Sequence, residues 1–151
     1  MATIKQVVGA RTALSVSSFA TLAAATYVTS GVYVPNTNQP VDVIVEVMAG
    51  TINAPAGNKQ LAVFVQDSLD GTNFRSGPTA GTSTADEVDL TYLGTVPVNT
   101  SAGVMLHRGL FSIVNSCGYV PHTFRVVFKN DLGVALTTAE AATAEISMTV
   151  A

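Results

Sequence analysis

The sequence is poor in the side chains that carry charge, redox chemistry or catalysis. Only 11% of its 151 residues are charged, against about 25% in an ordinary soluble domain, and the net charge is −3. There is no tryptophan, and the single cysteine, Cys117, excludes an intramolecular disulfide, so the fold does not depend on an oxidising compartment. No apolar run approaches the roughly 18 residues of a membrane-spanning helix, and no basic stripe is present to neutralise phosphates. We therefore expect neither membrane insertion nor nucleic-acid binding.

The residue types needed for catalysis or metal binding show no recognisable spacing. His107 and His122 are the only histidines, and neither has a metal ligand at a typical interval. The sequences Gly-x-Ser-x-Gly and Ser-x-x-Lys are absent, as is a phosphate-binding glycine loop. Acidic residues gather once, at Asp86, Glu87 and Asp89, which leaves a calcium site and a solvated acidic rim as alternatives. We predict no catalytic residue, no metal site and no cofactor.

What the sequence has in abundance is the material of β-sheets. Val, Thr and Ile are plentiful, and 12 glycines and 6 prolines interrupt them. Strict apolar–polar alternation predicts half-buried strands at 41–47 and 144–150. Residues 61–67 are apolar on both faces, which predicts a central strand, and 124–129 predicts another. Weaker strands are predicted at 4–8, 27–34, 91–98 and 106–114, and Pro97 places its strand at a sheet edge.

Turn residues separate these strands. Asp70-Gly71 predicts a hairpin, because both residues tolerate the positive φ that tight hairpin turns need. A second hairpin is predicted at 130–133, with Gly133 in the left-handed conformation. The alanine-rich segment 137–142 predicts a single helical turn in a loop. Seven or eight short strands with regular turns predict one all-β domain, a β-sandwich or jelly-roll-like fold.

The first 25 residues differ from the rest because small and polar residues dominate them. Lys5 and Arg11 ahead of an apolar stretch resemble a secretory signal, but serines interrupt that stretch. We predict an N-terminal arm over 1–25 and a β-sandwich domain over 26–151. The apolar side chains of the arm are predicted to contact partner proteins, and they are Ile4, Val7, Val8, Leu14, Val16 and Phe19.

A surface so poor in charge is the main functional indication. Monomers usually keep charge on their surfaces for solubility, so part of this exterior is expected to be covered by other proteins. The arm is suited to add a strand to the edge of a neighbour's sheet. Deletion of residues 1–20 is expected to leave a folded body that no longer binds its partner. A robust monomer with a threonine-rich surface is the alternative.

Several segments, taken in order, resemble small phage virion proteins of the head-decoration, or cement, kind. The segment Ser-Leu-Asp-Gly-Thr-Asn-Phe at 68–74 is the most recognisable part, and the likeness covers about three quarters of the chain. The matching segments are 26–28, 43–50, 63–74, 93–98, 124–130 and 133–136.

The resemblance implies a β-sandwich bound to the outside of an icosahedral shell. The implied partners are the major capsid protein and further copies of the same chain, as a dimer or trimer, with assembly in a bacterial cytoplasm. No catalytic or ligand-binding residue transfers from that class. A tail, neck or fibre-base component and a carbohydrate-binding β-sandwich are the alternatives, and the lack of tryptophan counts against the second.

Overall fold

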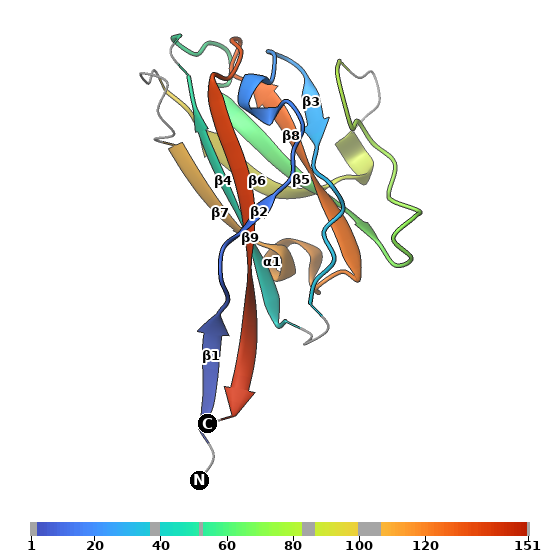
Figure 1. Ribbon diagram of the computed structural model, residues 1–151. Helices are drawn as coiled ribbons and strands as arrows, with labels where there is room; N and C mark the ends of the chain where they lie inside the picture. Colours follow the sequence, from blue (N-terminus) through green and yellow to red (C-terminus); the bar gives the residue numbers. More distant parts are fainter. Residues whose placement is uncertain (1–2, 37–39, 52, 83–86, 100–106, 151) are drawn as a thin grey trace.

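The computed structural model describes residues 3–36, 40–51, 53–82, 87–99 and 107–150, which form a sandwich of two antiparallel sheets (Figure 1). The first sheet has the order β1-β9-β4-β7, with β2 also paired to β9, and the second has the order β3-β8-β5-β6. The strands are β1 (Ile4–Val8), β2 (Thr12–Leu14), β3 (Tyr27–Thr29), β4 (Asp42–Gly50), β5 (Gln60–Ser68), β6 (Thr91–Pro97), β7 (His107–Ser112), β8 (Thr123–Asp131) and β9 (Thr138–Val150). The short helices are η1 (Phe19–Thr21), η2 (Glu87–Asp89) and α1 (Ile113–Cys117). The predicted all-β sandwich is confirmed.

The core lies between the sheets and consists of the alternate residues that face inward. In β4 the side chains of Val43, Val45 and Val47 are fully buried, as the alternation predicted. They belong to the same apolar cluster as Val63 of β5 and Phe124 of β8. Burial of each such side chain contributes about 1.5–3 kcal/mol, so this alternating pattern fixes which face of each strand points inward.

The two sheets differ in what covers their outer faces. On the second sheet, Phe64 and Val127 point outward and are buried together with Leu90. The guanidinium of Arg125 also lies 4.3 Å from the ring centre of Phe74. Both Phe74 and Leu90 belong to the long connection between β5 and β6, so the chain itself covers this face. As a result β5 is buried on both faces, as predicted for a central strand.

The Asp70-Gly71 turn exists, but the prediction that it closes a hairpin is wrong. The Asp70 carboxylate accepts hydrogen bonds from the backbone N–H groups of Thr72 (2.9 Å) and Asn73 (2.7 Å), and Gly71 has a φ of 72°. The next strand, β6, begins only at Thr91. The Asp70 carboxylate stabilises the turn through these local hydrogen bonds, so the turn does not need a paired second strand. The turn leads instead into the connection between β5 and β6, which covers the second sheet.

The prediction of a hairpin at 130–133 is also wrong, although Gly133 has the expected left-handed conformation with a φ of 71°. Strands β8 and β9 lie in different sheets, so the turn carries the chain across the sandwich. The buried Asn130 side chain holds this crossing. Its amide N–H groups donate to the carbonyls of Leu22 (2.8 Å) and Val134 (2.9 Å), and its oxygen accepts from the Leu132 N–H (2.9 Å).

The alanine-rich segment at 137–142 is not a helical turn: residues 138–142 form the beginning of β9, which is 13 residues long. Its residues pair with β4 in register from Gly50↔Thr138 to Asp42↔Ile146. Pairing with a buried neighbour strand outweighs the helical preference of alanine. A short helix that the sequence did not predict, α1, follows β7, where the Ser112 side chain accepts from the Asn115 N–H.

The predicted N-terminal arm is divided in two by the structure. Residues 12–14 pair with β9, and Val16 forms an isolated bridge with Ser30, directly after β3 of the other sheet, so this part closes one side of the sandwich. Only β1 extends beyond the body, together with the C-terminal end of β9 (Figure 1). Among the described residues, no helix is long and apolar enough to cross a bilayer.

Candidate functional site

A two-stranded ribbon projects from one end of the sandwich, formed by β1 and residues 146–150 of β9 (Figure 1). All five residues of β1 are exposed, and the strand has substantial contacts only with β9. A two-stranded ribbon without further support is marginally stable in water. This element therefore differs from the rest of the fold, because no described residue outside the ribbon covers either of its faces along most of its length.

One face of the ribbon is almost entirely apolar. Directly paired residues of antiparallel strands point to the same side, so the pairs Ile4↔Val150, Gln6↔Met148 and Val8↔Ile146 share a face. The exposed fractions are 68% for Ile4, 66% for Val8, 61% for Met148 and 74% for Val150. The opposite face carries Lys5, Val7, Ser147 and Thr149. We call the first of these surfaces the apolar ribbon face.

The ribbon also has free strand edges. Pairing between β4 and β9 ends at Asp42↔Ile146, so the β4 side of residues 147–150 has no partner strand among the described residues. On the other side, β1 is the outermost strand of its sheet. Unpaired N–H and C=O groups along such edges can pair with a strand of another chain. The ribbon thus combines exposed apolar side chains with free backbone hydrogen-bonding groups.

The apolar ribbon face continues onto the outer face of the first sheet. Ile44 and Met48 of β4 are partly exposed there, and Leu110 of β7 is 58% exposed. The charged side chains of this face compensate one another, because Glu46 forms ion pairs with Arg11 and Arg108, and Arg11 also pairs with Glu140. The hydrogen bond from Arg11, followed by the nearby charge of Arg108, lowers the pKa of Glu46. This accessible face contrasts with the covered outer face of the second sheet.

The six predicted contact residues fall into two groups. Ile4, Val7 and Val8 lie exposed on the ribbon, with Val7 on the side opposite to the other two. The other three, which were also predicted to contact a partner, pack within the chain's own core instead: Leu14 and Phe19 are buried, and Val16 is half-buried. Phe19, for example, lies 4.2 Å from Phe128 between ring centres.

Met148, Val150 and Leu110 are exposed as well, although they are not among the six predicted contact residues. The alternation at 144–150 indicates only that one face of the strand is apolar. It does not say whether the rest of the fold reaches far enough to cover that face.

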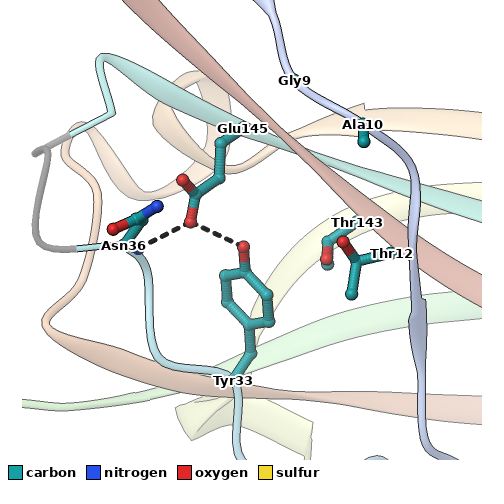
Figure 2. A pocket seen from close by; sticks show the side chains of 7 residues that line it. All are labelled: Gly9, Ala10, Thr12, Tyr33, Asn36, Thr143 and Glu145. Atoms are coloured by element: carbon teal, nitrogen blue, oxygen red, sulfur yellow. Dashed lines mark hydrogen bonds between the residues drawn. The ribbon is translucent and has the colours of Figure 1, made fainter.

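A polar pocket of about 270 Å³ lies at the root of the ribbon, where the chain bends between β1 and β2 (Figure 2). The Glu145 carboxylate accepts hydrogen bonds from the Tyr33 hydroxyl (2.8 Å) and from the Asn36 backbone N–H (2.6 Å). Burial, together with the bond to Glu145, raises the pKa of Tyr33 to about 12. The residues that line the pocket are Gly9, Ala10, Thr12, Tyr33, Asn36, Thr143 and Glu145.

The remaining reactive side chains do not form a chemical site. His107 lies on β7, whereas His122 lines a separate pocket among prolines and valines. Burial raises the pKa of Cys117 to about 11, which keeps its thiol protonated at neutral pH. Within the described ranges, no group of three or more His, Cys, Asp or Glu side chains could hold a metal ion.

The acidic cluster of the sequence is divided between other partners. Glu87 accepts a hydrogen bond from the Tyr27 hydroxyl and pairs with Lys129 (2.8 Å). Asp89 accepts from the Ser76 hydroxyl, and Asp86 lies outside the described residues. The carboxylates of Glu87 and Asp89 are therefore already engaged: Glu87 holds the connection between β5 and β6 to β3 and β8, and Asp89 bonds within that connection.

Comparisons with known proteins give little. No family model matches the sequence. No curated protein matches it either. Among solved structures, that of infectious bursal disease virus Gx strain aligns with 98% of this chain and 42% of that chain, with 11% identity and a TM-score of 0.19. The chain thus spans less than half the length of that protein, and so low a score does not establish a common fold.

Proposed function

We propose that this chain is a structural protein of a virion, and specifically a decoration protein that attaches to the outer surface of a phage head. Its partners in this proposal are the major capsid protein and further copies of itself. The role is one of binding between subunits, without a chemical reaction. It accords with the family resemblance of the sequence, which no comparison tests.

The observation that carries the proposal is the apolar ribbon face with its free strand edges. Four large apolar side chains of this ribbon, those of Ile4, Val8, Met148 and Val150, are each more than 60% exposed. Their burial by another protein contributes favourable free energy at about 25 cal/mol per Å² of apolar surface. Pairing of a partner strand along β1 or along residues 147–150 adds backbone hydrogen bonds in the manner of β-augmentation.

The composition of this surface suits attachment at many equivalent sites on a shell. Apolar contacts keep their strength in salt, whereas exposed ion pairs are screened. Each copy needs only modest affinity, because a homo-oligomer that contacts several shell subunits gains affinity through effective concentration. On the outer face of the first sheet, Glu46 and Glu140 balance Arg11 and Arg108, so these groups place no unpaired charge in the contact.

Co-sedimentation with empty shells of the major capsid protein from the same genome tests the proposal. Ile4→Asp places a charge on the apolar ribbon face, whereas Val7→Asp places the same charge on the opposite face of the same strand. We expect Ile4→Asp to weaken shell binding by roughly tenfold or more, equivalent to about 1.4 kcal/mol, and Val7→Asp to change it by less than about twofold. Both positions are exposed, so equal melting temperatures serve as the folding control.

Wild-type binding by Ile4→Asp would remove the ribbon from the contact and with it the main support for the proposal. Failure of the wild-type protein to sediment with shells, combined with binding to isolated tails or necks, would assign the chain to another part of the virion. Sedimentation velocity of the free protein tests its self-association, and we expect a dimer or trimer.

A further inference from the structure

The polar pocket at the root of the ribbon is not explained by apolar docking. It lies beside Gly9, where the chain leaves β1 and turns toward β2 (Figure 2). The Gly9 N–H donates to the Glu145 carbonyl (2.7 Å), and a side-chain carbon at Gly9 would lie 3.2 Å from that oxygen. Glycine therefore allows the backbone to stay close to β9 at this point, and the bend that follows leaves the cavity open between Ala10, Thr12 and Tyr33.

Among the described residues, the negative charge of Glu145 in this pocket has no counter-charge. Glu46, Glu87 and Glu140 each form an ion pair with an arginine or a lysine. Glu145, by contrast, has no cationic partner within 4 Å among the described residues, and its two hydrogen bonds come from neutral donors. Both of those bonds end on Oε1, which leaves the lone pairs of Oε2 for a further donor.

A buried hydroxyl adds a second acceptor. Thr143 lies two residues before Glu145 on the same face of β9 and is 1% exposed. Its Oγ1 is buried and lies close enough to the Tyr33 hydroxyl to lower the pKa of that phenol, but in the described part of the chain it makes no hydrogen bond of normal geometry. Figure 2 places it beside Thr12 and near the Tyr33 hydroxyl, within the same pocket. A bound donor would complete the hydrogen bonding of this buried hydroxyl.

We infer that this pocket, which opens on the Val7 side of β9, binds the ammonium group of a lysine side chain that reaches past the edge of the ribbon from the protein on which the ribbon docks. The ammonium has three donors and no acceptor, which matches the carboxylate Oε2, the Thr143 hydroxyl and one of the hydroxyls of Thr12 and Tyr33. A guanidinium fits this set of acceptors less well, because its paired N–H groups favour both oxygens of a carboxylate and Oε1 is already occupied. That the lysine belongs to the docking partner rests on the proposed function, whereas the ability of the pocket to bind an ammonium group does not.

The pocket chemistry is tested with the free protein and n-butylammonium as the probe, by two-dimensional amide NMR at constant ionic strength. We expect saturable shifts at Gly9, Thr143 and Glu145, and no such shifts with n-butanol, which has the same stem without the charge. Glu145→Gln should weaken binding at least tenfold. The matched control is Glu140→Gln, which removes a carboxylate of the same strand outside the pocket and should leave binding unchanged.

Thr143→Val gives an independent variant of nearly the same shape, and it too should weaken butylammonium binding. Equal shifts with butanol, shifts that do not saturate, or full binding by Glu145→Gln would each overturn the inference and leave the pocket a site for water only.

The shell assay separates this inference from the proposed function. If Glu145→Gln binds shells as tightly as the wild type while Ile4→Asp does not, the lysine contact is wrong and the docking proposal stands. If butylammonium binds as expected but Ile4→Asp retains full shell binding, the pocket chemistry stands and the docking proposal fails.

Discussion

At the scale of single residues, Tyr33 links the second sheet to the root of the ribbon. Its ring lies 5.1 Å from that of Phe124, and its hydroxyl donates to Glu145, a residue 112 positions away. The raised pKa means that the folded state holds the phenolic proton more tightly than the unfolded chain does. The resulting stability is fully present below pH 10 and is lost as the pH rises through about 12.

This pH dependence predicts a difference between the wild type and Tyr33→Phe. The free energy of unfolding of the wild type should fall between pH 10 and about 12 relative to that of the variant, which has no phenol to ionise. Urea unfolding of both proteins at a series of pH values provides the measurement. A difference between the two that does not change with pH would show that Tyr33 is not held by burial and Glu145 as described.

Asn130 is the second residue whose role is local but decisive. Its side chain is fully buried. Through three hydrogen bonds it joins Leu22 to Leu132 and Val134, which lie in the turn between β8 and β9. Asn130→Ala leaves two carbonyls and one N–H without these partners and should lower the free energy of unfolding by about 3 kcal/mol. Asn115→Ala, at an exposed position, should change it by less than about 0.5 kcal/mol. Equal effects in chemical denaturation would contradict this role.

At the scale of elements, the division of the N-terminal 25 residues changes the deletion experiment. Removal of residues 2–9 takes away only β1 and the bend, so the melting temperature should stay close to that of the wild type. Removal of 1–20 also takes Leu14 and Phe19 out of the core, where loss of one phenylalanine alone costs about 3–5 kcal/mol.

Urea unfolding of the two truncated proteins distinguishes these cases. Only the shorter deletion should give a stable body that fails to bind shells. A stable protein after removal of 1–20 would mean that the segment with β2 and η1 is not part of the core.

The strands were predictable from sequence where alternation is strict, as in β4, and where both faces are apolar, as in β5. The alanines of 139–142 have no such pattern, and their strand conformation comes from pairing with β4. The Asp70-Gly71 turn was predictable because its chemistry is local, whereas the strand that follows it was not. The pocket could not be predicted, because it joins Gly9, Tyr33 and Glu145 from distant parts of the chain, and no spacing rule relates them.

At the scale of the whole molecule, the account depends on an asymmetry between the two ends and the two faces of the sandwich. One sheet is covered on its outside by the chain between β5 and β6, whereas the other sheet and the ribbon that continues it remain accessible. A partner is therefore expected to cover the ribbon and the accessible face, and to leave the covered sheet unchanged.

Hydrogen exchange followed by mass spectrometry, on the free and the shell-bound protein, tests this claim most directly. Amides of β1 and of residues 147–150 should exchange rapidly in the free protein, because a ribbon of two strands opens readily, and should become protected on shells. Amides of the connection at 69–82 should exchange equally in both states. Protection confined to that connection, with the ribbon exchanging as fast on shells as in solution, would contradict the account.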